Sequence, residues 1–73
     1  MEDKRLGLKK MLIELEHEAE SISSRVRDLE WQMVHYSDDY ERDKMADDRR
    51  KAMDKLKYVR SNIAEIKIRL LEE

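Results

Sequence analysis

The stretch from Leu8 to Tyr40, LKKMLIELEHEAESISSRVRDLEWQMVHYSDDY, places an apolar or small residue at alternating steps of four and three. Its positions are Leu8, Leu12, Leu15, Ala19, Ile22, Val26, Leu29, Met33, Tyr36 and Tyr40. An average step of 3.5 residues keeps such a stripe on one side of a helix of 3.6 residues per turn. The stretch therefore predicts a long helix with a heptad seam, a surface for packing against another helix.

A second seam follows after a break and lies two residues out of phase with the first. Its positions are Met45, Ala52, Leu56, Val59, Ile63, Ile66 and Leu70, and one charged residue, Arg49, interrupts it. The two seams match in length, so they can close on each other as antiparallel helices in a register where paired residue numbers sum to 78. Only Leu29 then meets a charged residue, and we expect the Arg49 stem to lie along the core with its head in water. The pattern predicts an antiparallel, coiled-coil-like helical hairpin of the all-α class.

The sequence leaves two alternatives open: a hairpin in a different register and one continuous helix. A slipped register summing to 71 brings Glu18 closer to Lys55 and Arg25 closer to Asp48, but it moves the turn to Tyr36 and leaves Met33 without a partner. One continuous helix that absorbs the phase slip is the other alternative, because the break contains neither glycine nor proline. We prefer the first register, because core burial outweighs exposed ion pairs.

The break has residues typical of a helix start. Asp38 is followed three residues later by Glu41, a spacing at which side chains cap the free N–H groups of a first turn. We expect a single helical-hairpin unit over residues 1–73, with a helix over about 3–36, a turn at about 37–39 and a helix over about 40–71.

The composition is typical of long helices rather than of a mixed globular domain. Of the 73 residues 47% are charged, and the chain has one glycine, no proline and no cysteine. The net charge of −2 gives no overall attraction to nucleic acid or to an anionic membrane. The longest run of large apolar residues, Met11 to Ile13, is far shorter than a membrane span or a signal-peptide core. We expect a soluble, cytoplasmic protein.

Several apolar residues lie off the seams and form a candidate protein-binding surface. They are Leu6, Ile13, Trp31, Val34, Tyr58, Ile68 and Leu71. Scattered exposed hydrophobic residues are common, so an ordinary surface is one interpretation. The other is a second contact face, because tryptophan is enriched where proteins touch.

A basic block from Arg49 to Arg60 offers a candidate nucleic-acid-binding surface. Arg50, Lys51 and Lys57 share an outward side of the helix with Tyr58, which could stack on a base. The neighbouring turn is acidic and would repel a polyanion. We therefore rank this interpretation below a solvated helix surface whose charges set its register against a partner.

The sequence contains little that indicates chemistry. Glu14 and His17 have the Glu-x-x-His spacing of di-iron helical bundles, but the motif occurs once and heptad phase turns it away from the seam. The serines lack the base and orienting acid of a catalytic triad, and two helices form no deep pocket. We expect no catalytic residues, no metal site, no cofactor and no enzymatic activity.

These observations predict a protein-association module. One seam is a small core for 73 residues, so the leading interpretation is a homodimer forming a four-helix bundle, as a scaffold or regulator. The alternative is a helper or chaperone-like subunit that binds a helix of a different protein. A nucleic-acid-binding accessory is the third interpretation.

Overall fold

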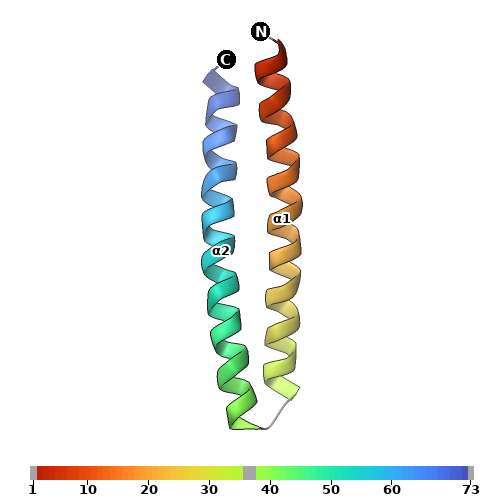
Figure 1. Cartoon of the computed structure of the whole chain (residues 1–73), viewed down its shortest axis with the longest axis vertical. Helices are drawn as coiled ribbons and strands as arrows, with labels where there is room; N and C mark the ends of the chain where they lie inside the picture. Colours follow the sequence, from red (N-terminus) through yellow and green to blue (C-terminus); the bar gives the residue numbers. More distant parts are fainter. Residues whose placement is uncertain (1, 36–37, 73) are drawn as a thin grey trace.

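The computed structural model describes residues 2–35 and 38–72, and it is an antiparallel helical hairpin (Figure 1). Helix α1 covers Glu2–His35 and helix α2 covers Asp39–Glu72. The helices lie side by side along their whole length, so both ends of the chain lie at one end of a rod of 56 × 14 × 13 Å. The described residues contain no strand. The predicted all-α hairpin is confirmed.

The limits of both helices lie within one residue of those expected from the sequence. Asp39, the last residue of the turn expected at about 37–39, is the first residue of α2. Ser37 and the seam residue Tyr36 lie outside the described residues. The phase slip between the seams is therefore a change of helix and not a distortion within one helix.

The two seams form the core of the hairpin. Among the residues whose side chains the structure describes, six hydrophobic ones are buried: Ile22, Val26, Leu29, Leu56, Val59 and Ile66. The remaining described seam positions are half-buried, with Tyr40 as the exception. The heptad spacing thus identifies the buried stripe of each helix.

Tyr40 corrects the predicted first seam, because its side chain is 77% exposed. It lies in the first turn of α2 and follows the phase of that helix. Tyr40 lies five residues before the seam residue Met45. Because five residues do not complete a whole number of helical turns, its side chain points away from the stripe that faces α1. The first seam therefore ends before Tyr40.

The centre of the core contains both members of four layers expected for the register that sums to 78. These layers are Leu15 with Ile63, Ala19 with Val59, Ile22 with Leu56 and Val26 with Ala52, and all eight residues belong to one packed cluster. The ion pair expected for the alternative register is present as well, since Lys55 Nζ lies 3.7 Å from Glu18 Oε1. Long side chains bridge the axial offset, so this pair does not require the slipped register.

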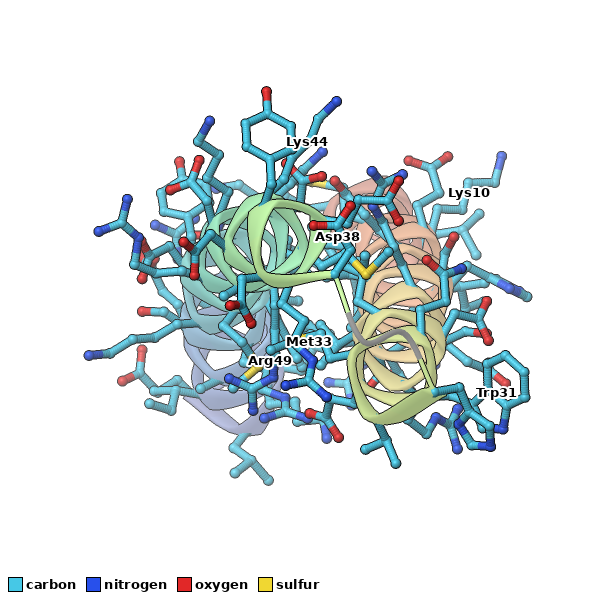
Figure 2. The ribbon with its side chains drawn as sticks, turned by 90° about the horizontal axis from the view of Figure 1, so that it is seen from below. Lys10, Trp31, Met33, Asp38, Lys44 and Arg49 are labelled. Carbon is cyan, nitrogen blue, oxygen red and sulfur yellow. The ribbon has the colours of Figure 1, made fainter. Side chains whose placement is uncertain are left out.

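Arg49 stands at the mismatched layer and links the two helices. Its Nε donates a hydrogen bond of 2.9 Å to Glu30 Oε1, and the two side chains are 41% and 47% exposed. Seen along the hairpin in Figure 2, Arg49 and Met33 both lie at the gap between the two helices. The guanidinium therefore reaches a carboxylate on α1 while the side chain remains partly exposed, an ion pair that the seam pattern does not predict.

Asp38 caps α2, as its position in the sequence predicts. Its Oδ1 accepts a hydrogen bond of 3.1 Å from Tyr40 N–H, and its carbonyl accepts one of 3.0 Å from Arg42 N–H. The side chain thus satisfies a backbone donor that has no partner within the helix. Asp39 and Glu41 add negative charge to this first turn, where the helix dipole favours it.

Replacing this cap gives a first testable prediction. We expect Asp38→Ala to lower the free energy of unfolding by about 1 kcal/mol, because it leaves the Tyr40 N–H without its side-chain acceptor. Chemical denaturation followed by circular dichroism measures the change. Asp38→Asn is the matched control, since asparagine caps as well as aspartate does. Equal losses in the two variants would contradict a capping role.

Candidate protein-binding surfaces

The hairpin leaves two long sides open, one along each edge of the buried seam. We call one the Lys55 side, formed by the residues flanking the seam at the edge where Glu18 meets Lys55. We call the other the Arg49 side, where Glu30 meets Arg49. The Arg49 side consists of positions at alternating steps of three and four along each helix. On α1 these are Leu6, Lys9, Ile13, Glu16, Glu20, Ser23, Arg27, Glu30 and Val34. On α2 they are Asp43, Ala46, Arg50, Met53, Lys57, Arg60, Ala64, Lys67 and Leu71. Because the seam is filled within the hairpin, a partner can bind only these sides or the outer helix surfaces.

All seven apolar residues of the predicted contact surface are exposed. The exposed fractions lie between 55% and 86% for Leu6, Ile13, Trp31, Val34, Tyr58, Ile68 and Leu71. Four of them lie near the open end of the hairpin, where the chain ends meet, and Trp31 and Val34 lie near the turn. The seven residues are therefore available to a partner in the single chain.

The structure does not bring these seven residues together on one side. Those on the Arg49 side are Leu6, Ile13, Val34 and Leu71. Tyr58 leans toward the Lys55 side, while Trp31 and Ile68 lie on the outer surfaces of α1 and α2, opposite the seam. Figure 2 shows Trp31 pointing away from α2. A single partner surface cannot cover Trp31 and Ile68 together, because they face opposite directions.

Trp31 has a neighbour within its own helix. The indole stacks on the His35 ring with centroids 4.0 Å apart and an interplanar angle of 17°. His35 Nδ1 lies 2.9 Å from the Trp31 carbonyl oxygen, and the donated hydrogen bond fixes the imidazole in place. The stack covers part of the indole, so the presence of tryptophan on the surface does not by itself require a partner protein.

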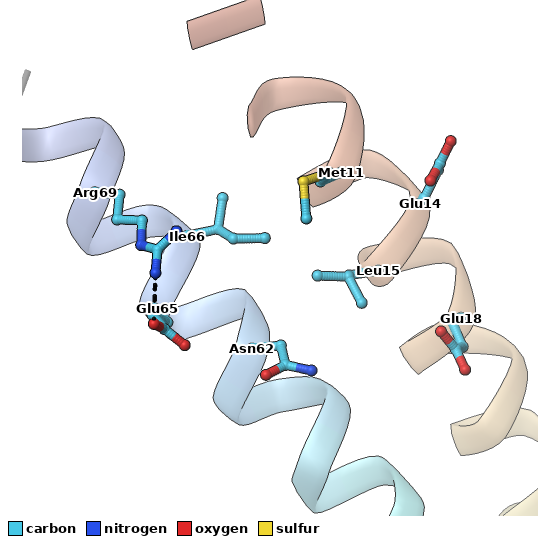
Figure 3. A pocket seen from close by; sticks show the side chains of 8 residues that line it. All are labelled: Met11, Glu14, Leu15, Glu18, Asn62, Glu65, Ile66 and Arg69. Carbon is cyan, nitrogen blue, oxygen red and sulfur yellow. Dashed lines mark hydrogen bonds and ion pairs between the residues drawn. The ribbon is translucent and has the colours of Figure 1, made fainter. Parts of the chain in front are cut away.

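An apolar groove of about 380 Å³ opens on the Lys55 side near the open end of the hairpin (Figure 3). Met11, Leu15 and Ile66 point into the space between the helices, and charged residues form the rim. Of these, Glu65 accepts a 3.0 Å hydrogen bond from Arg69. Met11 is 52% exposed and is not among the contact residues predicted from the sequence. Its place beside the seam, one step before Leu12, is the signal that could have identified it.

The basic block is largely engaged in ion pairs within the hairpin. Arg50 Nη2 and Lys51 Nζ lie 2.7 and 3.2 Å from the two Asp47 carboxylate oxygens. The hydrogen bond from Lys51 and the charge beside it lower the pKa of Asp47 below its ordinary value, and Arg50 lowers it further. Lys57 and Arg50 lean toward the Arg49 side, whereas Lys51 leans toward the Lys55 side. The three candidate nucleic-acid-binding residues therefore do not form one row.

The described residues contain neither a candidate metal site nor a segment that could span a membrane. Across residues 4–35 and 38–72, no group of three or more histidine, cysteine or acidic side chains is arranged to hold a metal ion. Within the same ranges, neither helix has an apolar segment long enough to cross a bilayer. Glu14 lines the rim of the apolar groove, while His17 does not line it.

Comparison with known proteins gives no relative. No family model, curated protein or solved structure matches this chain.

Proposed function

We propose that this chain is a non-enzymatic protein-association module, a small scaffold or regulator that works as a homodimer in a four-helix bundle. The observation that carries the proposal is the imbalance between the core and the remaining apolar surface. Among the described residues six hydrophobic side chains are buried, whereas ten large ones are between 39% and 86% exposed.

A two-helix hairpin buries one stripe of each helix and leaves the rest in water. Small domains bury a low fraction of their surface, and oligomerisation is a common way to add burial. A second copy supplies that burial with the same helices and the same charged surface. Nearly half of the residues are charged, which suits helices whose outer surfaces face water, and we propose the cytoplasm as the location.

Mass measured against concentration tests this proposal. We expect sedimentation equilibrium to give twice the chain mass of 8.9 kDa at micromolar concentration. We also expect the melting temperature to rise with protein concentration, because unfolding is then coupled to dissociation. A monomer with a concentration-independent melting temperature would contradict self-association. The helix of a different protein would then become the better candidate partner.

A further inference from the structure

The Arg49 side carries unlike charges on its two helices. On α1 the middle of this side is acidic, with Glu16 and Glu20. On α2 the corresponding stretch is basic, with Lys57 and Arg60. All four side chains are exposed, and the ion pairs within the described hairpin involve other residues. On this side the charges in the middle of α1 are therefore opposite in sign to those in the middle of α2.

Apolar residues occupy the same side toward the open end. Leu6 and Ile13 of α1 are 56% and 57% exposed, and Leu71 of α2 is 86% exposed. Ala64 lies between Leu71 and the basic stretch. The Arg49 side thus combines an apolar end with a charged middle section.

We propose that a second copy of the chain docks on the Arg49 side, with the two-fold axis parallel to the long axis of the hairpin. Helix α1 of each copy then packs on α2 of the other, and the two open ends lie together. This inference rests on the homodimer proposed above and specifies its surface and orientation.

This orientation brings complementary residues to the same height. Rotation about a two-fold axis parallel to the helices leaves every residue at the same height along the hairpin. Helix α1 therefore meets the partner's α2 in nearly the same layers as it meets its own α2. The resulting layers pair Leu6 with the partner's Leu71, Ile13 with the partner's Ala64, Glu16 with the partner's Arg60 and Glu20 with the partner's Lys57. The two-fold axis makes each of these contacts twice.

Two layers of this arrangement bring like charges near each other. Lys9 approaches the partner's Lys67 beside the apolar end, where long stems lie along the surface and place their charges in water. Arg27 approaches the partner's Arg50. Because Asp47 holds Arg50 at 2.7 Å in each copy, a carboxylate lies beside this second layer.

The opposite orientation, with each turn beside the other copy's open end, is disfavoured by charge. It would place α2 on the partner's α2, so that Lys57 meets its own symmetry mate. Glu20 would meet its own symmetry mate on α1 as well. Like charges set directly against each other cost affinity, and only the α1-on-α2 arrangement avoids both contacts.

The area available suits a stable dimer. The hairpin is 56 Å long. Two helices of about 10 Å diameter present a side on the order of 1,000 Å² per copy. A standard interface buries about 800 Å² per partner. One side of the hairpin is therefore large enough.

Charge exchange tests both the surface and the orientation. We expect E16K/E20K and K57E/R60E each to weaken the homodimer about 100-fold, because four exposed ion pairs per dimer become repulsive. The four substitutions combined exchange the two charge patches and restore the net charge, so we expect dimerisation close to that of the parent. E14K/D28K is the matched control, since it makes the same charge change on α1 away from the Arg49 side.

The outcomes separate this inference from the proposed function. A monomeric parent contradicts both. A dimeric parent that tolerates E16K/E20K contradicts the α1-on-α2 contact on the Arg49 side and leaves the homodimer standing, because with α1 on α1 the change only replaces one like-charge contact by another. If the two double variants dissociate but the fourfold variant stays monomeric, the pairing of Glu16 and Glu20 with the partner's Arg60 and the partner's Lys57 is wrong, because exchanged opposite charges would attract again. Sedimentation equilibrium at fixed ionic strength measures every case.

Discussion

Ile66→Ala is expected to lower the free energy of unfolding by about 2 to 5 kcal/mol, the largest loss among the substitutions considered. The Ile66 side chain is 5% exposed and packs in the α1–α2 interface. Its truncation removes apolar contact between the helices and enlarges the groove that Ile66 lines, which leaves space that the two helices cannot readily fill. Total stability of a small domain is only about 5–15 kcal/mol, so such a loss is a large fraction of it.

Ile68→Ala provides a matched control on the same helix. It makes the same chemical change two residues later, where the side chain is 55% exposed on the outer surface of α2. We expect a change within about 0.5 kcal/mol. Both variants are compared with the parent at one protein concentration by chemical denaturation, since dimerisation adds to apparent stability. Similar losses in the two variants would mean that the buried stripe does not face α1 as described.

The hairpin could be predicted from the sequence because two physical signals agree. Heptad spacing identifies the stripe that each helix buries, and the phase slip at Asp38 separates the helices. The cap at Asp38 could be predicted as well, because capping depends on local spacing alone. These features follow from the helical repeat and from short-range hydrogen bonding.

The surfaces could be predicted less completely. The exposure of Trp31 and Ile68 follows from heptad position, but their opposite directions require the arrangement of both helices in space. The bond between Arg49 and Glu30 was missed because the register sets Arg49 opposite Leu29, and a long side chain then reaches a neighbour off the seam. Such contacts depend on rotamers and axial offset, which a periodic pattern does not specify.

Substitutions at Arg49 separate the contribution of the apolar seam to hairpin stability from that of the ion pair with Glu30. We expect Arg49→Leu to raise the free energy of unfolding by about 1 kcal/mol, because leucine completes the seam opposite the buried Leu29. The lost ion pair counts for little, since its two side chains are 41% and 47% exposed and such pairs contribute about 0–1 kcal/mol. We expect Arg49→Glu to lower the same free energy by about 2 kcal/mol, because a half-buried carboxylate then faces Glu30.

Glu30→Gln isolates the ion pair from the apolar layer. It removes one charge and leaves the Arg49 stem in place, so we expect a loss below about 1 kcal/mol. If Arg49→Leu lowers stability by more than Glu30→Gln does, the hydrogen bond between the helices outweighs the burial that leucine adds. The interruption in the second seam would then be a stabilising contact. If stability instead rises as expected, Arg49 occupies a core position at a cost, and its charge is better explained by setting the register of the two helices than by strengthening their contact.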